Sequence, residues 1–129
     1  MGAALAVGGE VSPALRAKVL NGAGLLARQQ GDYPSARRLL EQALAIEREV
    51  GDPEAIAIAL HNLGNIASDQ GEYAMARALF EESLAIRREL DDSRGIASSL
   101  TGLGSVARAE GDFPLARLLY EQSLAIKRA

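Results

Sequence analysis

The chain has 129 residues, which is the length of one domain, and 48% of them are hydrophobic while 24% are charged, a composition typical of a folded protein. A formal net charge of −3 disfavours nucleic acid as a partner, because proteins that bind it usually carry a basic surface. With no cysteine and a single histidine, the sequence excludes disulfides, thiolate metal sites and metal sites built on two imidazoles.

No apolar run approaches the ~20 residues that span a bilayer, and residues 1–9 lack the basic start of a signal peptide. We therefore expect a cytoplasmic protein with no membrane partner, no metal and no cofactor. Residues 1–11 carry no hydrophobic periodicity and are expected to form a flexible leader. Residues 12–129 are expected to form a single domain.

Six helices are predicted in that domain, in three pairs that occupy approximately residues 12–51, 52–91 and 92–129. The first helix of each pair is expected over residues 13–29, 53–69 and 93–109. Short polar side chains that can accept hydrogen bonds from first-turn amides precede these starts, at Ser12, Asp52 and Asp92. The second helices begin after Gly31, Gly71 and Gly111 and run to about Val50, Leu90 and the chain end. Because the joining turns are short, paired helices must lie antiparallel.

The three pairs are copies of one another with a period of 40 residues. Residues 31–46 return as 71–86 and as 111–126, and half of the positions in this block are identical in all three copies. A fixed period of this size is typical of a stacked repeat array. Each first helix carries a mid-helix glycine, which costs ~1 kcal/mol relative to alanine. We expect these glycines (Gly24, Gly64 and Gly104) to allow close approach of the second helices at Ala36, Ala76 and Ala116. Arginine and glutamate four residues apart, as in Arg37/Glu41, Arg77/Glu81 and Arg117/Glu121, are expected to form exposed pairs.

The repeated residues resemble the tetratricopeptide repeat. In the second copy the matching residues are Leu60, Leu63, Gly64, Ala67, Gly71, Tyr73, Ala76, Phe80, Ser83 and Leu84. The period exceeds the 34 residues usual for that family. This longer form resembles kinesin light chain repeats and, over residues 87–97, the C-terminal arrays of bacterial STAND-type signalling ATPases and regulators. The resemblance implies an all-α solenoid of three helical hairpins in a right-handed superhelical stack. It also implies a non-catalytic protein-binding scaffold, here a piece of a larger bacterial signalling or regulatory protein.

The resemblance further implies a peptide-binding groove along the first helices. Its positions in this sequence are Lys18, Asn21, Leu25, Arg28 and Gln29, then Ile58, His61, Asn62, Asn65, Ser68 and Asp69, and finally Ser98, Thr101, Gly102, Ser105 and Arg108. Asparagine amides can bond both main-chain groups of an extended peptide, and Lys18, Arg28 and Arg108 favour an acidic or C-terminal ligand. Free variation of exposed residues is an equally good explanation of why the copies differ there. For His61, groove contact and simple solvation both stay open.

Catalysis is disfavoured by the residues present. His61 is the only candidate general base, and Asp69 stands ~12 Å further along the same helix. A nucleophile triad needs a histidine that touches both a serine and a carboxylate, and no such constellation is visible. We therefore expect a protein that is not an enzyme.

Self-assembly is the alternative to a peptide-binding scaffold. An apolar face at the C-terminal end would partly lack a following helix, and its residues are Leu115, Leu118, Leu119, Tyr120 and Leu124. The first helix carries a similar set, Leu15, Val19 and Leu26. Exposed apolar faces promote association, and a head-to-tail contact between such unlike ends makes a homo-oligomer that is a ring or a filament.

Overall fold

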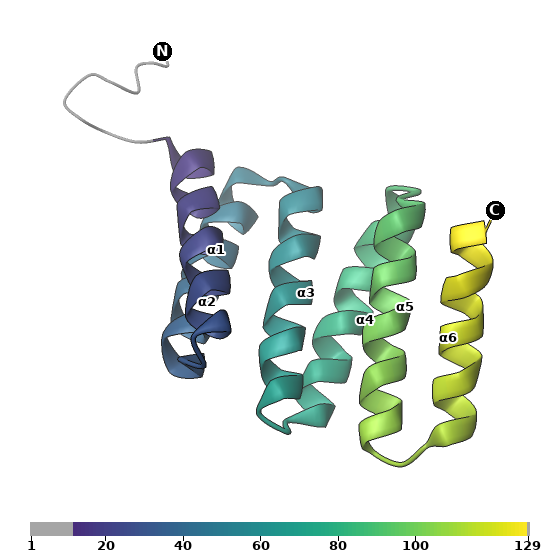
Figure 1. The fold of residues 1–129 in the computed structure, drawn as a ribbon. Helices are drawn as coiled ribbons and strands as arrows, with labels where there is room; N and C mark the ends of the chain where they lie inside the picture. Colours follow the sequence, from purple (N-terminus) through teal and green to yellow (C-terminus); the bar gives the residue numbers. More distant parts are fainter. Residues whose placement is uncertain (1–11, 129) are drawn as a thin grey trace.

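The computed structural model describes residues 12–128, so the leader expected at residues 1–11 lies outside the described part. That part folds into six α-helices with no β-strand. They are α1 (Pro13–Gln29), α2 (Tyr33–Val50), α3 (Pro53–Asp69), α4 (Tyr73–Glu89), α5 (Ser93–Ala109) and α6 (Phe113–Arg128). Figure 1 shows them standing side by side, with α1 and α6 at opposite ends of the row. Among these helices none is long and apolar enough to cross a membrane.

The helix boundaries follow the local sequence. The expected N-caps of the first helices are confirmed, because Ser12, Asp52 and Asp92 each accept a hydrogen bond from the backbone amide three residues ahead. Asp32 and Asp112 do the same for α2 and α6, a role that the sequence analysis did not assign. Capping side chains therefore begin five of the six helices.

The turns between helices depend on left-handed backbone conformations. Glycines with φ between 77° and 84° stand in the turns before α2, α4 and α6, at Gly31, Gly71 and Gly111. Gly51 (φ 82°) has the same role between α2 and α3, whereas Asp91 (φ 53°) occupies the equivalent turn between α4 and α5. Side chains with a Cβ are disfavoured in this region, although aspartate tolerates it better than most.

The mid-helix glycines do permit close packing, since a Cβ built on Gly24 would lie 3.4 Å from the backbone oxygen of Ala36, but a larger side chain comes closer still. A Cβ built on Gly64 would lie 2.9 Å from Cε1 of Phe80, and one on Gly24 would lie 2.8 Å from Cγ of Leu40. The closest side chain on the second helix is therefore the large residue four positions beyond the expected alanine. The alanine lacks the reach to fill that space, so it packs as a buried neighbour, as Ala76 does.

Charged side chains connect successive repeats, and the predicted pairing within the second helices is wrong. Arg37 was expected to pair with the glutamate four residues on, but its Nη2 donates to Oε1 of Gln70 at 2.8 Å and also to Glu72. Arg77 likewise pairs with Glu110 of the following repeat. When the repeats stack, the turn that ends the next first helix lies beside these arginines. The arginines therefore contact that turn instead of a glutamate on their own helix.

Candidate functional site

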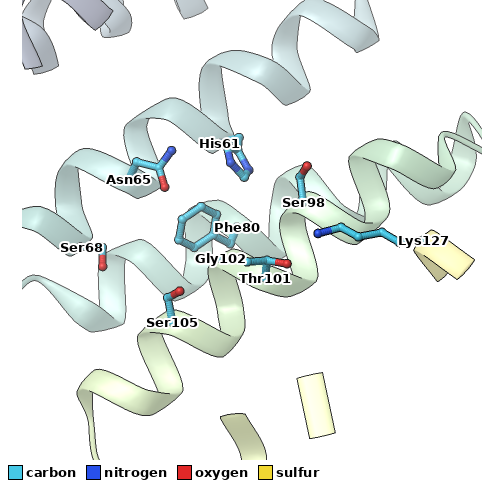
Figure 2. Close-up of a pocket in the computed structure, with 9 residues that line it drawn as sticks. All are labelled: His61, Asn65, Ser68, Phe80, Ser98, Thr101, Gly102, Ser105 and Lys127. Carbon is cyan, nitrogen blue, oxygen red and sulfur yellow. The ribbon is translucent and has the colours of Figure 1, made fainter. Parts of the chain in front are cut away.

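A cavity of about 260 Å³ opens between α3 and α5, and we call it the α3–α5 cavity. Its lining residues are His61, Asn65, Ser68, Phe80, Ser98, Thr101, Gly102, Ser105 and Lys127. Figure 2 shows side chains from the two neighbouring first helices around it, with Lys127 reaching toward it from α6. Seven residues of the predicted groove thus meet in one place, namely His61, Asn65, Ser68, Ser98, Thr101, Gly102 and Ser105.

Phe80 supplies the aromatic base of the α3–α5 cavity. The side chain is 1% exposed, because the backbones of α3 and α5 both pack directly on its ring. A Cβ built on Gly102 would lie 2.8 Å from Cε1 of Phe80. His61 contacts the same ring in an edge-on arrangement, with ring centroids 5.1 Å apart and an interplanar angle of 65°. The cavity base is therefore rigidly packed, while its walls are polar.

Behind His61 lies a buried arginine that sequence reasoning missed. The Nη1 of Arg87 donates to the hydroxyl of Ser99 at 2.9 Å and to the carbonyl oxygen of Gly95 at 3.2 Å, and it lies 3.3 Å from Nδ1 of His61. Because arginine has donors and no acceptor, Nδ1 of His61 is the acceptor in this contact. The proton of the neutral ring then sits on Nε2, which leaves that N–H as a donor.

The charge state of His61 follows from the same surroundings. Burial, with the positive charges of Arg87 and Arg28, lowers the pKa of His61 to about 4. His61 is therefore neutral at physiological pH. His61 is a half-buried cavity residue rather than a simply solvated one.

Arg87 belongs to a register position that is charged in every repeat: Glu47, Arg87 and Lys127. Nδ2 of Asn21 donates to Oε2 of Glu47 at 2.9 Å, and burial raises the pKa of that carboxyl group. Asn21 is thus held by its own repeat. The sequence held one signal for this position, because all three copies carry a charged residue there.

Other predicted groove residues lie apart from the α3–α5 cavity. Arg28 is paired with Asp69, since its Nε donates to Oδ2 of that carboxylate at 2.6 Å. Lys18 lines a separate depression between α1 and α3, and Arg108 lines another near the start of α6. Asn62 is half-buried and does not line the α3–α5 cavity.

The residues expected to drive self-association lie on α6. Leu115, Leu118 and Leu124 are 40%, 51% and 46% exposed, whereas Leu119 and Tyr120 are half-buried. The ring of Tyr120 packs on α5 at Gly104, and its hydroxyl oxygen lies 3.2 Å from Oγ of Ser105. Within residues 12–128, no group of three or more His, Asp or Glu side chains is placed to hold a metal ion.

A family model described as the tetratricopeptide repeat matches residues 15–89 and, one repeat later, residues 55–129. The chain belongs to the tetratricopeptide repeat family. Tetratricopeptide repeat (TPR) proteins are generally scaffolds for protein–protein interaction. No curated protein matches this chain in sequence.

Solved structures with the same TPR fold cover most of the chain. BtubC (BKLC) from P. vanneervenii is 23% identical with a TM-score of 0.80, over 87% of this chain and 46% of that one. The TPR domain of Arabidopsis FLU is 20% identical with a TM-score of 0.82, over 88% and 96%. TPR-like repeats of a Podosopora anserina protein described as a kinesin light chain are 26% identical with a TM-score of 0.77, over 91% and 57%. The chain therefore spans about half the length of the BtubC structure, and the likeness to kinesin light chain repeats is confirmed.

Proposed function

We propose that the chain binds an extended segment of another protein in the α3–α5 cavity. The observation that carries this proposal is the lining of the cavity. It presents four hydroxyl groups and one amide from two consecutive first helices, at Asn65, Ser68, Ser98, Thr101 and Ser105. Such groups can donate to and accept from the main chain of an extended peptide, and the proposal requires no catalytic step.

The charge of the cavity favours a carboxylate on the bound segment. Among the residues of 12–128 that line the cavity, Lys127 is the one that carries a formal charge, and none carries a carboxylate. His61 is neutral and can donate from Nε2. An acidic side chain or a free C-terminus seated there would accept hydrogen bonds from both groups, and a charged donor makes the stronger bond. In this proposal Lys127 takes the role that the sequence analysis gave to Lys18, Arg28 and Arg108, of which Arg28 is paired with Asp69 and the other two line separate depressions.

The test uses peptides selected from a random display library against the intact chain, with affinities measured by fluorescence anisotropy. Asn65→Ala is expected to weaken binding about threefold to tenfold through the loss of a peptide hydrogen bond. Asn62→Ala is the matched control, because the same residue type stands on the same helix outside the cavity. Equal losses in both variants, or no selected peptide that binds, would contradict the proposal.

The carboxylate part of the proposal has its own comparison. A selected peptide is resynthesised with each Asp or Glu changed to Asn or Gln, and separately with an amidated C-terminus. One of these peptide changes should weaken binding to the unmodified protein. The same change should have little further effect on binding to the Lys127→Gln variant. A loss of the same size in both proteins would show that the carboxylate binds elsewhere.

The proposed setting is the bacterial cytoplasm, in a larger signalling or regulatory protein that uses this module as a non-enzymatic scaffold. The support is the similarity of residues 87–97 to the C-terminal arrays of bacterial STAND-type proteins, together with the likeness to the BtubC structure, of which the chain spans about half. Nucleic acid is left out of the proposal because the net charge is −3. Sequencing the gene that encodes the chain, with its flanking regions, tests the larger-protein part directly.

A further inference from the structure

A second depression continues the α3–α5 cavity toward the N-terminal ends of α3 and α5. It has a volume of about 330 Å³, and we call it the Arg87 depression. Arg87 of α4, Ile58 of α3 and Arg94 of α5 are among the residues that line it. Ser98 lines both the depression and the cavity, and Figure 2 shows it at the same end of the cavity as His61. The two hollows are therefore parts of one furrow between the two first helices.

The furrow is long enough for several residues of an extended chain. On α3 it reaches from Glu54 to Ser68. At ~1.5 Å per helical residue this is roughly 21 Å, which an extended segment covers with about six residues at ~3.3 Å each. Ile58 in the depression and Asn65 in the cavity are roughly 10 Å apart along the helix, or about three such residues. A segment of that length in the cavity therefore also crosses the Arg87 depression.

Arg87 is a buried cation that has no carboxylate partner in the described part of the chain. The residue is 7% exposed, and none of the ion pairs within residues 12–128 includes it. Burial lowers the pKa of its guanidinium group, and the negative charge of Asp92 only partly offsets that effect. Because an unpaired cation is costly to remove from water, Arg87 offers a bound carboxylate a charge that is already desolvated.

The hydrogen bonds of Arg87 all come from one of its nitrogens. Nη1 contacts Gly95, Ser99 and His61. Nη2 and Nε form no hydrogen bond within residues 12–128, and neither is shut off from solvent. Nη2 and Nε form one edge of the planar guanidinium fork, which fits the two oxygens of a carboxylate. Arg28 holds both oxygens of Asp69 with the same two nitrogens, so Arg87 has a complete carboxylate-binding edge to spare.

The sequence of α5 makes room for the Arg87 side chain. A Cβ built on Gly95 would lie 2.7 Å from Cδ and 2.8 Å from Nε of Arg87, so a larger residue there would displace the guanidinium group. Ser99 supplies the hydroxyl acceptor one turn later. In the preceding repeat, where the second helix carries a glutamate instead, Ala55 and Ala59 stand at these two positions. The placement of Arg87 is therefore specific to the furrow between α3 and α5.

The other charged residues of the Arg87 depression leave that edge free. Oδ1 of Asp92 accepts from the backbone amide of Gly95 at 3.0 Å, so this carboxylate serves as the cap of α5. Glu54 and Arg94 are both exposed and carry opposite charges. Their charges offset one another in solvent, which leaves Arg87 as the buried charge of the depression.

We propose that the Arg87 depression binds an acidic side chain of the same protein segment that occupies the α3–α5 cavity. Nη2 and Nε of Arg87 donate to its two carboxylate oxygens, and Ile58 contacts its aliphatic stem. The acidic residue stands about three residues along the segment from the part that Asn65 binds. It is separate from the carboxylate assigned to Lys127. This inference rests on the proposed function and adds a second anchor to it.

The test starts from a selected peptide whose affinity for the intact chain falls in Asn65→Ala. Each position of the peptide is replaced in turn by Glu and by Gln, and affinities are measured by fluorescence anisotropy. At one position the Glu peptide should bind about tenfold more tightly than the Gln peptide, because a charged hydrogen bond is gained. This preference should persist in Lys127→Gln, since that lysine binds the other carboxylate.

Ile58→Glu and Ile58→Gln are the matched pair that locates the preference for Glu. Ile58 is 43% exposed, so both variants should fold, which circular dichroism checks. The carboxylate introduced by Ile58→Glu pairs with Arg87 and repels the acidic peptide, so the preference should disappear there and remain in Ile58→Gln. Gln42→Glu adds the same charge at an exposed position of α2 outside the furrow and should keep the preference.

NMR of Arg87 gives a second readout that leaves the depression unchanged. The Nε–H signal of Arg87 is assigned through its absence in Arg87→Lys. This signal should move further on addition of the Glu peptide than on addition of the Gln peptide.

The outcomes separate this inference from the proposed function. A peptide that depends on Asn65 but shows no preference for Glu at any position would overturn this inference alone. A preference that survives in Ile58→Glu, or an Nε–H signal that responds equally to both peptides, would do the same. If no selected peptide depends on Asn65, the proposed function and this inference fail together.

Discussion

Replacing Gly64 with alanine should destabilise the fold, although alanine is the better helix former. A Cβ at this position would lie 2.9, 3.0 and 3.1 Å from three atoms of the Phe80 ring. Carbon atoms in favourable contact are roughly 3.5–4.0 Å apart. The ring is 1% exposed and packs on α5 at Gly102, so any shift away from Gly64 would disturb that packing. Overpacking of this kind costs about 1–3 kcal/mol.

Gly22→Ala is the matched control for the helix-propensity effect. Gly22 is also in the interior of a first helix, but nothing lies within 4 Å of its Cβ. The substitution should therefore stabilise the chain by up to about 1 kcal/mol, the ordinary gain from glycine to alanine in a helix. Gly64→Ala has the same gain, so the difference between the two variants isolates the packing against Phe80.

Thermal unfolding followed by circular dichroism at low micromolar concentration measures this difference. For a chain of this length a gap of 1–3 kcal/mol corresponds to a difference in Tm of roughly 4–12 °C. Gly22→Ala should unfold above the unmodified chain, and Gly64→Ala well below Gly22→Ala. Equal upward shifts in both variants would refute the packing argument, because the ring would then have room for the methyl group.

Two further predictions concern pH and backbone strain. The pKa of His61 is about 4 in the fold and near 6.5 in the unfolded chain, so the folded state loses about 2–3 kcal/mol of stability between pH 7 and pH 4. His61→Gln can still accept from Arg87 without titrating, and urea unfolding at both pH values should show a smaller loss; equal losses would contradict this. Asp91→Gly should raise the free energy of unfolding by about 0.5–1 kcal/mol, since φ is 53° there and glycine occupies the equivalent turn at Gly51. An unchanged or lower Tm would show that this turn is not strained.

Local features of the fold were predictable because local residues determine them. The helix starts follow capping side chains such as Asp52 and Asp92, and the turns follow glycines such as Gly31. The period of 40 residues then predicts that the helices and turns of one repeat recur in the next. A stacked all-α array follows from these features alone, whereas the groove on the first helices was implied only by the resemblance to the tetratricopeptide repeat.

The composition of the cavity was only half predictable. Asn62 and Asn65 looked equivalent in the sequence, yet only Asn65 lines the α3–α5 cavity. Three residues turn a helix by roughly 300°, so the tilt of α3 against its neighbours decides which amide faces the opening. Arg87 was missed altogether, because burial of a cation becomes visible only when Ser99 and the carbonyl of Gly95 are seen beside it.

The sequence by itself determined the helices, their caps, their turns and the repeat, because each depends on residues within one or two turns of the chain. Tertiary structure alone decided the partners of the charged side chains. Arg37 bonds Gln70, and Arg28 bonds Asp69, across 33 and 41 residues. The physical reason is that a long charged side chain can reach several surfaces at similar cost, so the stacking angle between repeats, and not the local sequence, selects the one it meets.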